Sequence, residues 1–161
     1  TSVANYLYSL IKPTIPNLVL LDGDRIRELF GNLSDYSEPN RVKQVERLRS
    51  LAIFLSEQNI SVIVTVLYSS PDLMNWNRLN IKDYYEVYLD TPLETVMQRD
   101  AKGLYSKAVN GQMPNVVGLD IPWLPPEKPD LWINGGNGES AEKYAEQILL
   151  KCSILDQDLT P

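Results

Sequence analysis

The sequence predicts an α/β fold, in which a doubly wound, mostly parallel sheet is flanked by helices. Short apolar runs rich in β-branched residues alternate with longer amphipathic stretches, as expected when strands and helices alternate. Asp22 and Ser70-Pro71 fall at the carboxyl ends of two of the apolar runs. With 161 residues and a hydrophobic content of 43%, the chain suffices for one core, so we expect one domain over residues 1–161.

The elements follow from these patterns in chain order. The first helix has apolar residues at helical spacing and is broken by Pro13 and Pro16, and the next helical stretch opens at Pro39. We expect helices over 2–11, 39–58, 92–99 and 140–152, and strands over 18–21, 60–66, 85–89 and 131–133. The run 134–138 is interpreted as a turn, since it lacks the lysine of a phosphate loop. Ligands of such sheets bind at the carboxyl ends of the strands.

Composition narrows the chemistry. Histidine is absent and Cys152 is the single cysteine, which excludes an intrachain disulfide, an ordinary zinc ligand set and a histidine base. The formal charge is −6, from 15 basic and 21 acidic residues, without a linear basic patch that would indicate a nucleic-acid or membrane-surface partner. No signal peptide or apolar run of transmembrane length is found. We expect a cytoplasmic enzyme whose proton chemistry depends on carboxylates.

A compact motif, Asp22-Gly23-Asp24-Arg25-Ile26-Arg27, follows the first expected strand. Two carboxylates that bracket a glycine can project into a cleft, one toward magnesium or a substrate hydroxyl and the other toward polar groups of the ligand. The alternative is a turn with a helix N-cap at Asp24, which the Asp-Gly pair alone favours. Arg27 and Arg41 could each hold phosphate or sulfate oxygens with two hydrogen bonds, or could be solvated helix charges.

The segments 100–108, 117–122 and 125–130 are too polar and too rich in glycine and proline for a core, and predict a functional lid. Lys102-Gly103-Leu104-Tyr105, the segment 117–122 and the motif at Asp22 together resemble the adenylylsulfate (APS) kinase family, over nearly the whole chain to about Ile133. The resemblance implies a P-loop kinase fold, with transfer of the ATP γ-phosphate to the 3′-hydroxyl of adenylyl sulfate in sulfate assimilation. Mg²⁺ is the implied cofactor, ATP the co-substrate and nucleotides the partners, and a homodimer is left open.

The resemblance also implies the site. Asp22 and Lys102 would be catalytic, Thr1 and Asp22 would hold the metal, and Thr1, Ser2 and Arg99 would bind ATP. Closure of the lid over residues 102–120 would be the gating step. The implied substrate-binding residues are Asp24, Arg25, Ile26, Arg27, Tyr36, Arg41, Gln44, Ser69, Ser70, Val116, Gly118 and Asp120.

The beginning of the sequence differs from that of a P-loop kinase, which opens with a strand and the loop GxxxxGK[ST]. Neither is present, yet the run 1–7 resembles the residues that come after the lysine of that loop in APS kinases. We therefore expect the sequence to begin just inside the phosphate loop. A protein that lacked the loop altogether would instead be a non-catalytic nucleotide-binding module.

Several residues depart from the family pattern. Val116 stands in place of a stacking phenylalanine, Val117 of a threonine, Val109 of an arginine, Trp123 of a tyrosine, and Arg25 of an asparagine. Losing an aromatic face costs about 1–3 kcal/mol of stacking per base. These changes preserve the phosphotransfer residues and alter those that contact the base. They are expected if the acceptor is a related nucleotide, such as the cytidine diphosphoramidate used by kinases of capsule biosynthesis.

Overall fold

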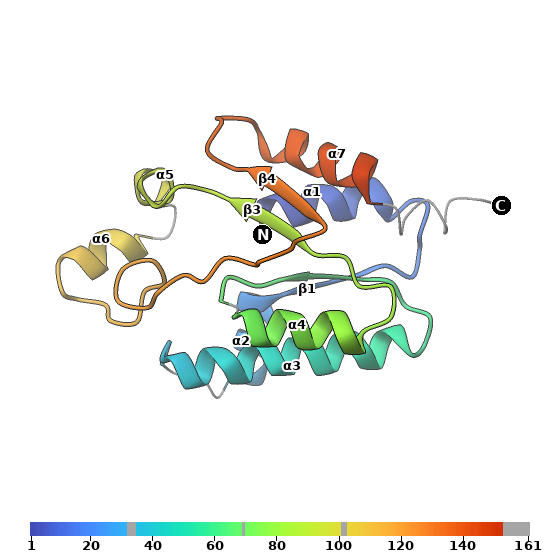
Figure 1. Cartoon of the computed structure of the whole chain (residues 1–161), viewed down its shortest axis with the longest axis horizontal. Coiled ribbons are helices and arrows are strands. Elements are labelled where there is room, and N and C mark those ends of the chain that lie inside the picture. The colour runs from blue at the N-terminus through green and yellow to red at the C-terminus, as the bar shows by residue number, and fades with distance from the viewer. Residues whose placement is uncertain (32–34, 69, 101–102, 153–161) are drawn as a thin grey trace.

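A computed structural model describes residues 1–31, 35–68, 70–100 and 103–152 and confirms an α/β architecture of parallel strands and flanking helices (Figure 1). The strands are β1 (Val19–Asp22), β2 (Val62–Thr65), β3 (Val87–Asp90) and β4 (Leu131–Asn134). The helices are α1 (Ser2–Ile11), α2 (Gly23–Phe30), α3 (Glu38–Ser56), α4 (Pro71–Asn80), α5 (Leu93–Arg99), α6 (Leu104–Val109) and α7 (Ala141–Lys151). Each expected strand is found, within one or two residues of its expected bounds.

Strands pair in two places. β1 runs parallel to β2, with Asp22 in register with Thr65, and β3 runs parallel to β4, with Asp90 in register with Asn134. Within the described residues the two pairs form separate two-stranded sheets, β1-β2 and β3-β4. The strand expected before a phosphate loop is not among these residues. In each pair the polar residue is the last of its strand, so the carboxyl ends carry the side chains that can meet a ligand.

Hydrophobic packing builds two layers of helices around the strands (Figure 1). α1 and α7 pack together and cover β4 in the largest core cluster, where Ala145 is fully buried. α2 and α3 pack on β1 through a second cluster, centred on Leu48 with an exposed fraction of 1%. The third cluster joins α3 to the segment 116–121 through Val45, Tyr68, Val117 and Ile121. This cluster fixes the long connection between α6 and β4 to α3, beside the candidate site.

The expected set of elements lacked three of the helices, namely α2, α4 and α6. α4 begins at Pro71, where the Ser70 side chain accepts a hydrogen bond from the Leu73 amide and proline occupies the first turn. α2 begins directly after β1, because the Asp22 side chain caps its first turn. It ends at Gly31, which has the left-handed conformation. Among the described residues, no helix combines the length and the apolar character that a membrane span requires.

Candidate active site

The Asp22 carboxylate lies at the end of β1 and accepts hydrogen bonds on both oxygens. Oδ1 accepts from the amides of Asp24 and Arg25, at 3.1 Å each, and so caps α2. Oδ2 accepts from the hydroxyls of Thr1, at 2.7 Å, and Thr65, at 2.9 Å. The alternative interpretation, an N-cap at Asp24, is therefore wrong in position, because Asp22 is the cap. The second oxygen of Asp22 takes no part in the cap and accepts from the two hydroxyls instead.

The same contacts keep Asp22 ionised. Partial burial opposes ionisation, but the hydrogen bonds from Thr1, Arg25 and Thr65 outweigh it and lower the pKa of Asp22 below its ordinary value. An ionised carboxylate can orient a hydroxyl and accept its proton late in a transfer.

Thr1 and Asp22 together offer a hydroxyl and a carboxylate oxygen at hydrogen-bond distance. Magnesium is bound in nucleotide enzymes by one or two oxygen ligands of the protein, with waters and substrate phosphates completing its shell. The pair fits that requirement. A cluster of three or more acidic, cysteine or histidine side chains, which an all-protein metal site would need, is not found in the described part of the chain.

The turn after Asp22 is fixed from α3. The Gln44 side chain, 4% exposed, donates its amide to the Gly23 carbonyl at 2.9 Å, and Arg47 donates to the Gln44 amide oxygen at 3.2 Å. A Cβ on Gly23 would lie 2.9 Å from the Thr65 carbonyl oxygen, so only glycine fits between the turn and β2. In the structure Gln44 is thus a brace for the turn, one helical turn beyond Arg41 on α3.

Arg27, Tyr36 and Arg41 form an aromatic and cationic group beside this turn. The guanidinium carbons of Arg27 and Arg41 lie 4.9 Å and 5.4 Å from the centroid of the Tyr36 ring. Burial and the neighbouring Arg27 charge lower the pKa of Arg41. Two cations next to one aromatic ring can serve the anionic part and the base of a nucleotide.

Arg41 also holds the backbone of two segments. It is 8% exposed, and its Nε donates to the Tyr36 carbonyl at 2.9 Å while its Nη2 donates to the Asn115 carbonyl at 2.7 Å. The segment 115–121 is further closed by Asp120, whose carboxylate accepts from the amides of Asn115 and Val116. Desolvation by the surrounding segment works against ionisation of the exposed Asp120, yet the hydrogen bonds from these amides lower its pKa. Asp120 is thus engaged with its own segment, and Arg41 joins that segment to Tyr36.

The carboxyl-terminal part of the expected lid is packed, which corrects the expectation that it is too polar for a core. Val116, Val117 and Ile121 have exposed fractions of 5–7%, and the last two belong to the cluster with Val45 and Tyr68. A tight turn makes this burial feasible, because the Gly118 amide donates to the Ile121 carbonyl at 2.8 Å. Gly118 has φ +91°, and a Cβ there would lie 2.9 Å from a Leu93 methyl group.

The remaining expected residues fall into other settings. Ile26 is buried in the cluster with Leu48, Arg25 forms an exposed ion pair with Glu28, and Ser70 caps α4. Ser2 is the exposed first residue of α1, and Arg99 at the end of α5 lies 3.4 Å from the Gly135 carbonyl. Ser69 and Lys102 lie outside the described residues.

Three residues beside the site were not among the expected site residues. Thr65 contacts Asp22 directly. Tyr68 is buried near Arg41, and its hydroxyl donates to Glu38 at 2.7 Å; burial and this carboxylate raise the pKa of Tyr68 to about 12. Burial raises the pKa of Tyr105, which is half-buried on α6, and the charge of nearby Arg41 acts in the opposite direction. The available signal was position alone, since Thr65 lies near the end of an expected strand and Tyr68 shortly after it.

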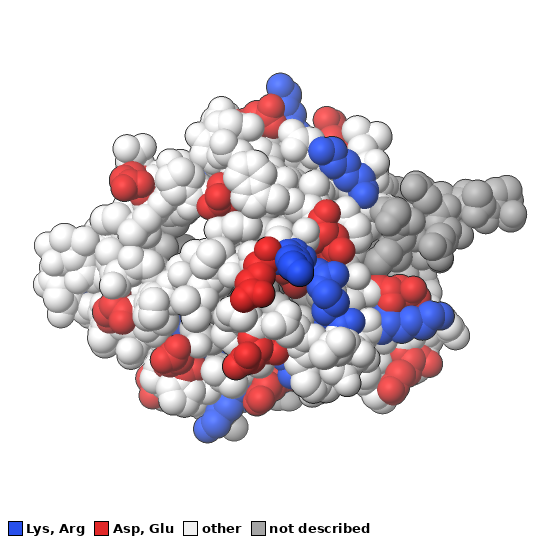
Figure 2. Space-filling view, in the orientation of Figure 1, with Lys and Arg blue, Asp and Glu red and all other residues white. Residues whose placement is uncertain are grey.

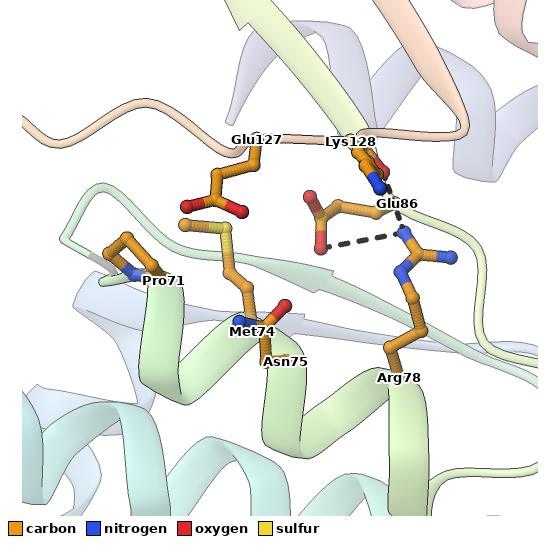
Figure 3. A pocket seen from close by; sticks show the side chains of 7 residues that line it. All are labelled: Pro71, Met74, Asn75, Arg78, Glu86, Glu127 and Lys128. Carbon is orange, nitrogen blue, oxygen red and sulfur yellow. Dashed lines mark hydrogen bonds and ion pairs between the residues drawn. The ribbon is translucent and has the colours of Figure 1, made fainter.

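A pocket of about 130 Å³ lies elsewhere, between α4 and the segment before β4 (Figure 3). Its side chains are those of Pro71, Met74, Asn75, Arg78, Glu86, Glu127 and Lys128. Arg78 is held by Asp130 at 3.0 Å and by Glu86 at 3.8 Å, so the pocket is built around an ion-paired arginine. None of the expected site residues lines it. On the face shown in Figure 2, acidic and basic side chains intermingle over this region.

Comparisons with known proteins place similar sequences and structures in one family. A family model described as adenylylsulphate kinase matches residues 1–134. The chain is 36% identical to a cytidine diphosphoramidate kinase of Campylobacter jejuni, over 96% of this chain and 89% of that protein. It is also 36% identical to a probable adenylyl-sulfate kinase of Archaeoglobus fulgidus, over 83% of this chain and 86% of that one.

Among solved structures, the fold is similar to that of an APS kinase of Mycobacterium tuberculosis in complex with AMPPNP and APS. The TM-score is 0.79 at 28% identity, with 96% of this chain and 89% of that chain covered.

Proposed function

Because the chain belongs to the adenylylsulphate kinase family, we propose that it transfers the γ-phosphoryl group of ATP to a sugar hydroxyl of a nucleotide acceptor. The observation that carries the proposal is the Asp22 carboxylate, which lies at the end of β1 with one oxygen directed at two hydroxyls. Arg41, one helical turn from the brace Gln44, holds the Tyr36 carbonyl and lies beside the Tyr36 ring. We also propose that residues 1–161 form one kinase domain.

In this proposal Asp22 orients the acceptor hydroxyl and takes its proton late in the transfer. Arg27 and Arg41 hold the anionic group of the acceptor, with the unused donors of Arg41 facing the ligand, and Tyr36 stacks on its base. Mg²⁺, held by Thr1 and Asp22, would offset the charge of the ATP phosphates. Lys102 would neutralise charge on the transferred group, and a Lys102→Ala variant is expected to lose turnover.

Positioning supplies most of the rate of such a transfer, so the fixed parts of the site matter. The turn at Gly23 and the segment 115–121 are both anchored to α3, by Gln44 and by Arg41. If a lid closes over the ligand, we expect its movement to be confined to the residues before Asn115. Arg99 and Ser2 are proposed to contact ATP, and Asp24, Arg25, Ser69 and Ser70 the acceptor.

Two acceptors are proposed. Adenylyl sulfate, phosphorylated at its 3′-hydroxyl, is supported by the family motifs and by the named adenylyl-sulfate kinases among the relatives. Cytidine diphosphoramidate is supported by Val116, which is buried where the family stacks a second aromatic ring, and by the Campylobacter relative, which matches over nearly its whole length. Without the second ring, the site loses about 1–3 kcal/mol of stacking on the base that the family binds. We therefore expect cytidine diphosphoramidate to be the faster acceptor. A cytoplasmic location and a homodimer remain further proposals.

The test is an ADP-release assay with ATP and Mg²⁺ on the full-length protein, comparing adenylyl sulfate, cytidine diphosphoramidate and simple nucleotides. ATP alone gives the background rate, and Asp22→Asn is the inactive control. Faster turnover with cytidine diphosphoramidate supports the second acceptor, and turnover confined to adenylyl sulfate supports the first. No turnover with any acceptor would contradict the kinase proposal and favour a nucleotide-binding module.

A further inference from the structure

Thr65 is the last residue of β2 and lies in register with Asp22, the last residue of β1. Side chains in register on neighbouring parallel strands project to the same face of the sheet. The Thr65 hydroxyl donates to Asp22 Oδ2 at 2.9 Å from a half-buried position, whereas Thr1, the other donor to this oxygen, is exposed. Of the two hydroxyls, that of Thr65 is the one built into the sheet.

The main chain of Thr65 constrains the same turn. Its carbonyl oxygen lies 2.9 Å from the position that a Cβ of Gly23 would take, so the turn packs directly against the end of β2. On the other side, Gln44 donates to the Gly23 carbonyl at 2.9 Å. The residue after Asp22 is therefore clamped between a strand end and a helix, and Thr65 contacts both Asp22 and Gly23.

Because of these contacts, the two oxygens of the Asp22 carboxylate have different functions. Oδ1 is committed to α2, because it accepts the amides of Asp24 and Arg25. Oδ2 is the oxygen available to a ligand, which would exchange with the exposed Thr1 hydroxyl while the Thr65 bond persisted. We propose that Thr65 is a positioning residue that holds Asp22 Oδ2 in the orientation needed for phosphoryl transfer. The kinetic part of this inference rests on the proposed function, but the positional part does not.

A purely structural role for Thr65 makes a different prediction. Valine has nearly the shape of threonine and a high strand propensity, so it would fill the same place in β2. Serine retains the hydroxyl but loses the methyl group. If Thr65 acts through its hydroxyl, then Thr65→Val is defective and Thr65→Ser is close to the natural protein. If Thr65 serves only packing, the order is reversed.

The first measurement is amide hydrogen exchange at Asp24 and Arg25, monitored by NMR on the full chain without ligands. In Thr65→Val the freed carboxylate can rotate and release these amides, so their exchange is expected to become faster by roughly tenfold, as for the loss of one hydrogen bond to a charged group. Thr65→Ser and the exposed control Thr14→Val are expected to match the natural protein. Unchanged exchange in Thr65→Val would overturn the proposal.

The second measurement is steady-state kinetics with the best acceptor. Thr65→Val is expected to lower kcat by about ten- to hundredfold with little change in KM for ATP, because misplacement of a reacting group affects the chemical step. Thr65→Ser should restore kcat to within about twofold. Equal kcat in the two variants would refute the positioning role. Absence of activity in the natural protein would refute the proposed function instead, and the exchange experiment would still test the orientation.

Should Thr65→Val fail to fold, as judged by circular dichroism, Gly23→Ala takes its place. The added methyl group presses on the Thr65 carbonyl and moves the turn while the Thr65 hydroxyl is retained. We expect faster exchange at Asp24 and Arg25 and a similar loss of kcat. Natural values for both would contradict the clamp.

Discussion

The Arg41→Lys substitution tests whether Arg41 acts as a joint, that is, whether its two hydrogen bonds link Tyr36 to the segment 115–121. Arg41 is buried and donates to two backbone carbonyls, those of Tyr36 at 2.9 Å and Asn115 at 2.7 Å. A lysine keeps the charge, but its single ammonium group cannot reproduce the two divergent donors. At least one of these part-buried hydrogen bonds from a charged donor is then lost, which costs about 1.5–3 kcal/mol.

Urea unfolding measures this loss. With a slope of about 1–3 kcal/mol/M for a protein of this class, the midpoint should fall by roughly 1 M while the slope stays unchanged. Arg49→Lys is the matched control, because Arg49 lies on the same helix and also donates twice, to Asn77 at 2.7 Å and Leu73 at 3.1 Å. Both variants should lose stability, but only Arg41→Lys should expose the amides of the segment 115–121 to hydrogen exchange. A loss below about 0.5 kcal/mol, or equal exchange in both variants, would refute the role of Arg41 as a joint.

Three further predictions concern stability. Leu48→Ala, at the least exposed large side chain, should lower the free energy of unfolding by about 2–5 kcal/mol in urea, and a smaller loss would mean that the α2–α3 cluster collapses around the cavity. Partial burial opposes ionisation of Asp130, but the hydrogen bond from Arg78 lowers its pKa below 3.8. Ionised Asp130 therefore stabilises the folded protein above pH 4, and this stabilisation is lost as the pH falls through the lowered pKa. Asp130→Asn should flatten the decline in stability between pH 5 and 2, and an unchanged decline would contradict the pairing. Gly118→Ala should cost about 1–3 kcal/mol in thermal unfolding, from its positive φ and the contact with Leu93, and an unchanged melting temperature would contradict both.

Patterns local in sequence predicted most of the architecture. The β-branched runs gave the strands, and the polar residue after the first of them, Asp22, is the centre of the candidate site. α4 was also within reach of such arguments, because Ser70 followed by Pro71 is a helix start signal, but the mixed polarity of the following residues gave no apolar face. Local patterns thus succeed where one helix or strand carries the signal.

Contacts between distant residues were not predictable in this way. Arg41 meets the Asn115 carbonyl 74 positions away, and Thr65 meets Asp22 across 43. The glycine and proline content of the segment after Val109 suggested exposure, whereas its valines are buried because the turn at Gly118 folds them onto α3. Composition describes a segment alone, and burial depends on the surfaces that the segment meets.

The packing of α1 against α7 has a consequence for how the chain folds. The first and last described helices share one core cluster with β4, so this cluster requires contacts that span nearly the whole sequence. Loops of that length close slowly, and a chain rich in such contacts folds more slowly than one with local packing. During synthesis, the apolar faces of Leu7, Ile11 and Leu18 would remain without their partners until Tyr144 and Ile148 had emerged from the ribosome. Folding of this half is therefore completed only after Tyr144 and Ile148 have emerged, and until then its apolar surface can be bound by chaperones.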